Sequence, residues 1–127
     1  MPSHRRIAIA TALALLCSLA AAQSFPQRSE LARNIEIADI QFTLGGFENV
    51  LVIKVKLKNR GKVPLKDFVF ECVTVSASGT EIGRPRHTLY QSLAPGQSKT
   101  FREVNIGFVN SQTARAGCEV IGATKQN

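Results

Sequence analysis

The fold of this chain is decided by one stretch of its 127 residues, NVLVIKVKLK, which runs from Asn49 to Lys58. Apolar side chains occupy every second position from Leu51 to Leu57, and lysines occupy positions 54, 56 and 58. Successive side chains of a β-strand point to opposite sides, so the apolar residues share one face and the lysines the other. The stretch therefore predicts a strand with one face in a hydrophobic core and the other in solvent.

Further short apolar runs lie on both sides of this stretch, separated by turn residues. We expect strands over residues 34–44, 67–75, 88–92, 99–108 and 116–123, with a loop or a poor edge strand over the proline-interrupted residues 81–87. The run 67–75 is apolar on both faces, which is typical of a central strand. The pair Pro95-Gly96 has the residue order of a type II turn.

The same pattern leaves little room for helices. After residue 22 no stretch keeps apolar residues at helical spacing for three turns, although residues 112–115 could form one helical turn. The sequence therefore predicts an all-β fold, an immunoglobulin-like antiparallel β-sandwich of about six or seven strands. An open barrel is the main alternative.

The first 22 residues have the three regions of an export signal. Arg5 and Arg6 supply a positive start, residues 7–20 are uncharged and rich in Leu and Ala, and Ala20-Ala21-Ala22 supplies the small residues that a signal peptidase requires. We expect cleavage before Gln23. A membrane anchor is the competing interpretation, but residues 7–20 are fewer than the roughly 20 that span a bilayer. A lipid-modified Cys17 is disfavoured because Leu16, which is not small, precedes it.

The part that remains after cleavage has the size and charge of one basic domain. Removing 22 residues leaves 105, and losing Arg5 and Arg6 lowers the formal net charge from +7 to +5. We expect residues 23–33 to form a flexible leader and residues 34–127 to form the β-sandwich, which would be periplasmic or secreted without a transmembrane anchor. An envelope protein or an anionic envelope surface is then a better partner than nucleic acid.

Two cysteines, Cys72 and Cys118, remain after cleavage. An even count in an exported chain indicates a disulfide bond, with two free buried thiols as the alternative. Their separation excludes a Cys-x-x-Cys redox motif, and no histidine stands near either at the spacing of a metal site. The expected bridge would pin the two sheets together around one core.

Positive charge is concentrated in one part of the domain. Lys54, Lys56, Lys58, Arg60, Lys62 and Lys66 follow one another without an acidic residue between them. We expect the first three to share a strand face, and Arg84 and Arg86 to extend this basic patch if the two loops lie at the same end of the sandwich. The patch could dock on an anionic lipid or an acidic partner protein. A solvated sheet face, or an edge that lysines protect from aggregation, is the alternative.

Several turns and strands occur in an order seen in a known group of domains. They are Lys58-Asn59-Arg60-Gly61, the aromatic-rich run 68–75, Ser78-Gly79, and the segment from Leu93 through Ala94-Pro95-Gly96 to Phe101. This order resembles FxLYD-type and related immunoglobulin-like envelope domains, over roughly residues 50–108.

This resemblance implies a fold and a compartment, and it transfers no catalytic residue. Residues 107–112 followed by Cys118 are also similar to small uncharacterised secreted proteins of proteobacteria. The chain departs from the FxLYD-type pattern at Ser76-Ala77, where those domains often carry a Tyr-Asp pair. The Cys72 and Cys118 pair is not a general feature of them either.

The sequence lacks the residue sets of common catalytic sites. Beyond the expected signal, His87 is the single histidine, and it stands in a basic segment that is expected to face solvent. A Gly-x-Ser-x-Gly motif, a phosphate-binding glycine loop and a set of metal ligands are all missing. We therefore expect a non-enzymatic module without a cofactor or metal, which binds another envelope component through its basic face. A small envelope enzyme with a Cys72/His87 thiol site is the alternative.

Overall fold

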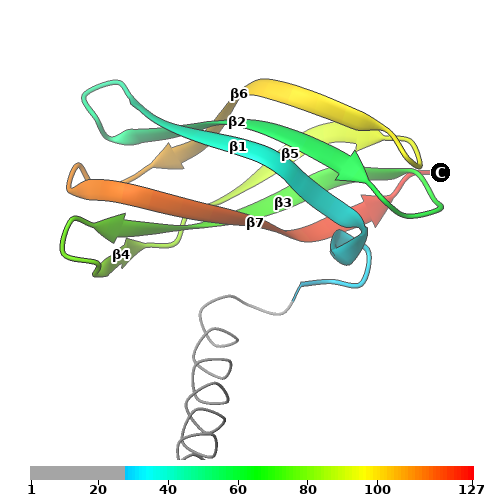
Figure 1. Ribbon diagram of the computed structural model, residues 1–127, viewed down its shortest axis with the longest axis horizontal. Coiled ribbons are helices and arrows are strands. Elements are labelled where there is room, and N and C mark those ends of the chain that lie inside the picture. The colour runs from blue at the N-terminus through cyan, green and yellow to red at the C-terminus, as the bar shows by residue number, and fades with distance from the viewer. Residues whose placement is uncertain (1–27) are drawn as a thin grey trace, which may run out of the picture.

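The computed structural model describes residues 28–127 as a sandwich of two antiparallel β-sheets (Figure 1). These residues form seven strands, preceded by one short 3-10 helix, η1 (Ala32–Asn34). The predicted all-β sandwich is therefore confirmed, at the upper end of the expected strand number. The predicted signal peptide, residues 1–22, and residues 23–27 of the predicted leader lie outside the described residues.

The first sheet has three strands, with the strongest sequence pattern in its centre. Its order is β1 (Ile35–Gly45), β2 (Val50–Asn59) and β6 (Ser98–Phe108). The apolar side chains of β2 that alternate with lysine, from Leu51 to Leu57, are at most 1% exposed. Alternation along β2 thus predicted correctly which face of the strand enters the core.

The second sheet is built around β3 (Leu65–Ser76), the strand that is apolar on both faces. β7 (Thr113–Lys125) pairs with one side of β3, while β4 (Glu81–Gly83) and β5 (Arg86–Leu93) follow each other along the other side. Between β4 and β5 the Cys72 N–H still donates to the Pro85 carbonyl at 2.9 Å. β4 and β5 therefore lie along one edge of β3, and the predicted loop or poor edge strand over residues 81–87 consists of β4, the interruption at Pro85 and the start of β5.

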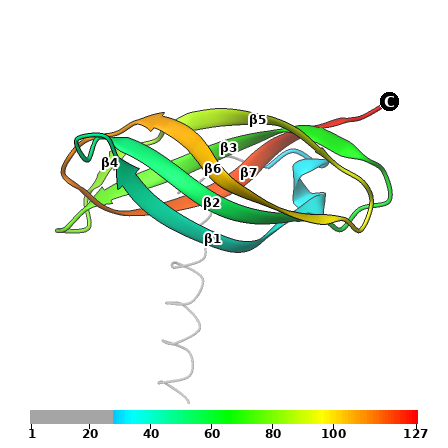
Figure 2. The same ribbon diagram turned by 90° about the horizontal axis from the view of Figure 1, so that it is seen from above.

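The core lies between the two sheets, whose strands run along the long axis of the molecule (Figure 2). Phe68 and Phe70 of β3 have no exposed surface, and they face the apolar residues of β2 together with Val104 and Ile106 of β6, each 3% exposed. Burial of one such large side chain stabilises the fold by about 1.5–3 kcal/mol. The inward-facing half of each central strand therefore supplies the main driving force for folding.

A disulfide bond joins Cys72 of β3 to Cys118 of β7, which confirms the expected pairing and rules out two free thiols. The two residues are directly opposite each other in the β3–β7 ladder. The bridge therefore links neighbouring strands of one sheet, and the prediction that it pins the two sheets together is wrong. The sequence could not reveal this, because the spacing of two cysteines does not say whether their strands are neighbours.

The turn residues act as the sequence predicted at one position and differently at another. Gly96 has a φ of 77°, the left-handed value that a type II turn requires after proline. The predicted helical turn at residues 112–115 is wrong, because Thr113 and Arg115 already pair with Ser76 and Val75 in the β3–β7 ladder. Pairing with an existing strand outweighs the weak local preference of this short segment.

Asn59, at the end of β2, is a buried polar residue that holds several turns together. Its side-chain amide donates to the carbonyls of Val63 at 2.8 Å and Leu93 at 3.1 Å, and its Oδ1 accepts the Gly61 N–H at 2.9 Å. Asn59 has no exposed surface, so these bonds replace the water that the amide loses on folding. This is the physical role of the Asn-x-Gly turn noted in the sequence.

The segment before β1 is packed against the domain from Arg28 onward. The Arg28 guanidinium donates to the carbonyls of Val120, Ala32 and Ile35 at 3.0, 2.6 and 3.0 Å. The Ser29 N–H donates to the Ile121 carbonyl at 3.0 Å, and Ala32 has no exposed surface. Over residues 28–33 the structure therefore differs from the predicted flexible leader. The sequence does not indicate this packing, because it depends on the hydrogen bonds that Arg28 donates to backbone carbonyls.

Candidate functional site

The predicted basic patch is divided between the two sheets. Lys54, Lys56 and Lys58 lie on the outside of β2 in the first sheet. Arg84 lies between β4 and β5, and Arg86 begins β5, both in the second sheet. Because the two outer faces point away from each other, the structure does not bring the arginines and lysines together into one surface.

Acidic residues of neighbouring strands reduce the charge of the lysine face. In the ladders beside β2, Glu36 of β1 stands opposite Lys58, and Asp39 stands opposite Lys56. Arg60, just after β2, forms an ion pair with Glu36 at 2.6 Å. Counting charges along the chain missed these partners, because strand pairing places residues about 20 positions apart side by side. The lysine face is a mixed-charge surface rather than a purely basic one.

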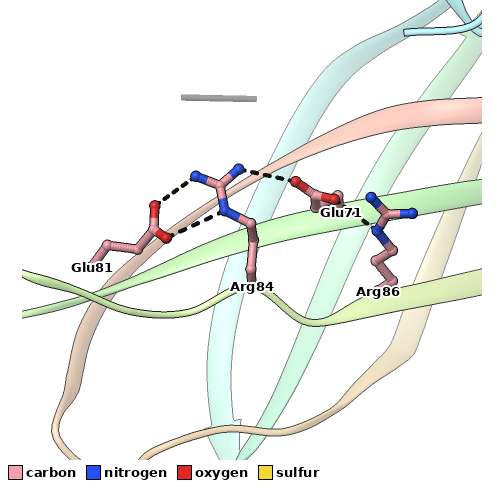
Figure 3. A network of polar contacts seen from close by, with 4 residues as sticks. All are labelled: Glu71, Glu81, Arg84 and Arg86. Carbon is pink, nitrogen blue, oxygen red and sulfur yellow. Dashed lines mark hydrogen bonds and ion pairs between the residues drawn. The ribbon is translucent and has the colours of Figure 1, made fainter. Parts of the chain in front are cut away.

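Arg84 and Arg86 surround a buried carboxylate (Figure 3). Glu71 is on the outer face of β3, between the core residues Phe70 and Cys72, yet its side chain is only 1% exposed. Arg84 Nη1 lies 3.1 Å from Glu71 Oε1, and Arg86 Nε lies 2.8 Å from Glu71 Oε2. The two guanidinium groups thus cover both oxygens of Glu71 and supply the charge that a buried carboxylate needs.

A second acid, Glu81 of β4, completes this network. Arg84 Nη2 and Nε contact the two oxygens of Glu81 at 2.7 and 3.3 Å. These hydrogen bonds, followed by those to Glu71, raise the pKa of Arg84 above its ordinary value. Arg84 therefore stays charged while it joins two carboxylates. The arrangement fastens the interrupted edge to β3 through both oxygens of Glu71.

The alternative thiol site is not compatible with the disulfide bond. A nucleophilic cysteine must be a thiolate, whereas the Cys72 sulfur is bonded to Cys118. His87 is in β5, opposite Phe70 of β3, and is half-buried. The structure therefore places no free thiol beside His87, and the Cys72/His87 site is excluded as long as the bridge is intact.

A groove that the sequence did not indicate lies between β1 and β7. It has a volume of about 460 Å³ and is lined by Arg28, Arg33, Ile35, Glu36, Ile37, Arg60, Cys118, Glu119 and Val120. Arg28 and Val120, which are in contact here, are 92 positions apart in the sequence. No local pattern could have identified the groove, because its arginines come from the segment before β1 and from the turn after β2.

The three arginines of the groove differ in what they can offer a ligand. Arg28 donates to three backbone carbonyls, so its role is chiefly to hold β1 and β7 together. Arg60 is paired with Glu36, although its side chain remains 61% exposed. Arg33 is exposed and has no ion pair within residues 28–127. Arg33 and Arg60 can therefore bind a carboxylate or another anion that enters the groove.

Other ligand classes find less support in the part of the chain that is described. Within residues 28–127 no three His, Cys, Asp or Glu side chains gather as metal ligands. No helix in this range combines the length and apolar character needed to cross a membrane. The groove between β1 and β7 is a candidate binding site because it brings together arginines from two separate segments.

Comparisons with known proteins give no assignment. No family model and no curated protein matches this chain. Among solved structures, the chain is similar to the X-ray structure of Northeast Structural Genomics Consortium target SoR45, with 10% sequence identity and a TM-score of 0.43. That match covers 75% of this chain and 87% of the other.

Proposed function

We propose that this protein is an exported, non-enzymatic binding module that holds an acidic segment of another cell-envelope protein in the groove between β1 and β7. The observation that carries the proposal is the convergence of Arg28, Arg33 and Arg60 around one groove from two separate segments. Two of these guanidinium groups face solvent and can form paired hydrogen bonds with a carboxylate.

The disulfide bond supports the location that this function requires. Structural disulfides form and persist in oxidising compartments, and the bond between Cys72 and Cys118 is compatible with the periplasm or the extracellular space. The signal-like residues 1–22 favour the same destination. Cleavage before Gln23 would remove the apolar run of residues 7–20.

The outer face of β2 is a second candidate surface for the same function. Lys54, Lys56 and Lys58 stand next to one another there, and an anionic envelope surface could contact all three. Glu36 and Asp39 oppose two of these lysines across the β1–β2 ladder, however, whereas the groove gathers three arginines. The groove is therefore the preferred site for a defined acidic segment.

Two matched variants separate the two surfaces. The groove variant carries Arg33→Glu and Arg60→Gln, and the face variant carries Lys56→Glu and Lys58→Gln, so that each changes the net charge equally. The probe is a fluorescein-labelled peptide of about ten residues, which is the length of one long β-strand. In this peptide glutamate alternates with valine, and a second peptide with glutamine in place of glutamate is the control.

We expect the groove variant to bind the acidic peptide at least about tenfold more weakly in fluorescence anisotropy, which corresponds to about 1.4 kcal/mol, while the face variant binds like the parent protein. Weakening in the face variant alone would move the site to β2. Equal affinity of both variants and the parent, or equal binding of the glutamine peptide, would contradict an arginine-based site.

A further inference from the structure

β1 and β7 are both edge strands, and they face each other across the opening between the two sheets. Among residues 28–127, β1 pairs with β2 alone and β7 pairs with β3 alone. The arginine-lined groove lies at one end of this opening, beside Ile35 and Val120. A smaller cavity of about 100 Å³ lies further along it, between Phe42–Leu44 and Thr113–Ala116. We refer to this opening, from Thr113 to Val120 of β7, as the seam.

The β3–β7 ladder determines which backbone groups of β7 face the seam. In an antiparallel pair, opposite residues alternate between hydrogen-bonded and non-hydrogen-bonded pairs. The Cys72 N–H donates to Pro85 on the far side of β3, so Cys72 and Cys118 are a non-hydrogen-bonded pair. The backbone N–H and C=O groups of Cys118 and Ala116 therefore point away from β3 and into the seam, up to the irregularity that interrupts the ladder between Arg115 and Thr113.

The chain already bonds to one end of this edge. The Ser29 N–H donates to the Ile121 carbonyl at 3.0 Å, and Arg28 Nε donates to the Val120 carbonyl at 3.0 Å. These contacts show that donors from an added segment reach carbonyls on the free side of β7. They stop at Val120, which leaves residues 116–118 as the regular part of the edge that can accept a further strand.

The side chains around the seam favour one type of added strand. Phe42 is on the inner face of β1 but is 38% exposed, because no strand covers it on the side of the small cavity. Alternate side chains of a strand along β7 would point toward Phe42, whereas those near Cys118 would reach Arg33 and Arg60. The small residues Ala114, Ala116 and Gly117 leave room for its backbone.

The geometry points to β-strand addition: the acidic segment binds in extended form along residues 116–118 of β7, with apolar side chains toward Phe42 and a carboxylate toward Arg33 and Arg60. This inference rests on the proposed function, since it specifies how the same partner occupies the groove and the rest of the seam. Charge complementarity selects the acidic segment, because two of the groove arginines retain exposed guanidinium groups.

Peptides with alternate N-methyl groups test the binding mode. One version of the glutamate–valine peptide is N-methylated at every odd residue and another at every even residue, so that each loses the N–H donors of one edge only. Strand addition along β7 uses one edge of the peptide. One version should therefore lose at least about tenfold in affinity, and the other should stay within about threefold of the unmodified peptide.

The outcomes separate this inference from the proposed function. If both N-methylated versions bind like the unmodified peptide, strand addition is wrong, while the groove and its arginines remain as the site. If both versions lose binding equally, the requirement for one edge is contradicted as well. If the unmodified peptide does not bind at all, the proposed function fails together with the inference.

A variant of the protein supplies the complementary test. Ala116→Pro removes an N–H that faces the seam, a position where an edge strand tolerates proline, and Ala116→Ser is the control that keeps this N–H. The proline variant should lose peptide binding while the serine variant keeps it, with equal thermal midpoints and an intact disulfide in both. If the proline variant does not fold, the N-methylated peptides decide the question with the parent protein.

A second copy of this chain is the competing occupant of the edge. Pairing of two β7 strands around Gly117 would place Arg115 of each copy opposite Glu119 of the other. If the edge binds the acidic segment instead, sedimentation equilibrium without peptide should show a monomer. A dimer that Arg115→Glu dissociates, and that the double variant Arg115→Glu with Glu119→Arg restores, would show that the edge serves self-association instead.

Discussion

Removal of the Cys72–Cys118 bridge should cost this domain a large part of its stability. The two cysteines are 46 positions apart. On the chain-entropy account, closing a loop of this length lowers the entropy of the unfolded chain and so stabilises the folded state by about 4 kcal/mol. The double variant Cys72→Ala with Cys118→Ala removes this restriction. It also removes the buried sulfur of Cys72, which has no exposed surface. We therefore expect a loss of at least about 4 kcal/mol in the free energy of unfolding.

Urea denaturation followed by far-ultraviolet circular dichroism measures this loss. A small domain with an m value of about 1–2 kcal/mol/M would show a midpoint about 2–4 M lower in the double variant. The parent protein in excess reductant is the control, and its midpoint should fall toward that of the double variant. The double variant itself should not respond to reductant, because it has no other cysteine within residues 23–127.

The reasoning would be refuted by a double variant whose midpoint matches that of the oxidised parent. That result would mean that residual β3–β7 pairing already restricts the unfolded chain without the bridge. It could equally mean that the bridge strains the folded state by as much as it restricts the unfolded one. Alkylation of both sulfurs in unreduced material would contradict the bridge itself. Intact mass should show the oxidised parent two hydrogens lighter than its reduced form.

Four other changes test the packing and hydrogen bonds of the domain. Asn59→Asp replaces the two N–H donors by a carboxylate oxygen that faces two carbonyls, at the positions where the bonds are 2.8 and 3.1 Å. The free energy of unfolding should fall by more than about 2 kcal/mol, with a lower thermal midpoint. A melt like that of the parent would show that the amide does not organise these turns. The Thr74 hydroxyl is buried without a hydrogen-bond partner among residues 28–127, so Thr74→Val should leave stability unchanged or raise it. A clear loss in urea titration would reveal an unrecognised partner. A Cβ at Gly83 would lie 2.7 Å from Thr74 Oγ1, so Gly83→Ala should destabilise the domain by about 1–3 kcal/mol. Adding Thr74→Ala should relieve part of that loss, and additive effects of the two changes would contradict the contact. Arg28→Ala removes three hydrogen bonds to backbone carbonyls and should lower the free energy of unfolding by about 2 kcal/mol. Hydrogen exchange at the Ser29 amide should become faster, and unchanged exchange would mean that Arg28 does not hold this segment.

Of the three arginines that line the groove, the sequence singles out one. Arg60 was named from the sequence as part of a basic run, and the structure places it in the groove. Arg28 and Arg33 were assigned to a flexible leader, because neither has a periodic apolar neighbourhood that signals burial. Arg84 and Arg86 were expected to extend a lysine patch, but they pair with Glu71 on the other sheet. Local charge counts cannot anticipate partners that strand pairing supplies.

The amino-acid sequence by itself determined the fold class, the strand β2 and its buried face, the central position of β3, the type II turn at Gly96 and the identity of the bridged cysteines. Side-chain alternation and turn chemistry act over a few neighbouring residues, and the two cysteines outside the expected signal allow only one bridge within the chain. Only the tertiary structure decided that the bridge lies within one sheet, that acids flank the lysines and that arginines line a groove. Those features depend on strand order and register, which bring together segments as far apart as Arg28 and Val120.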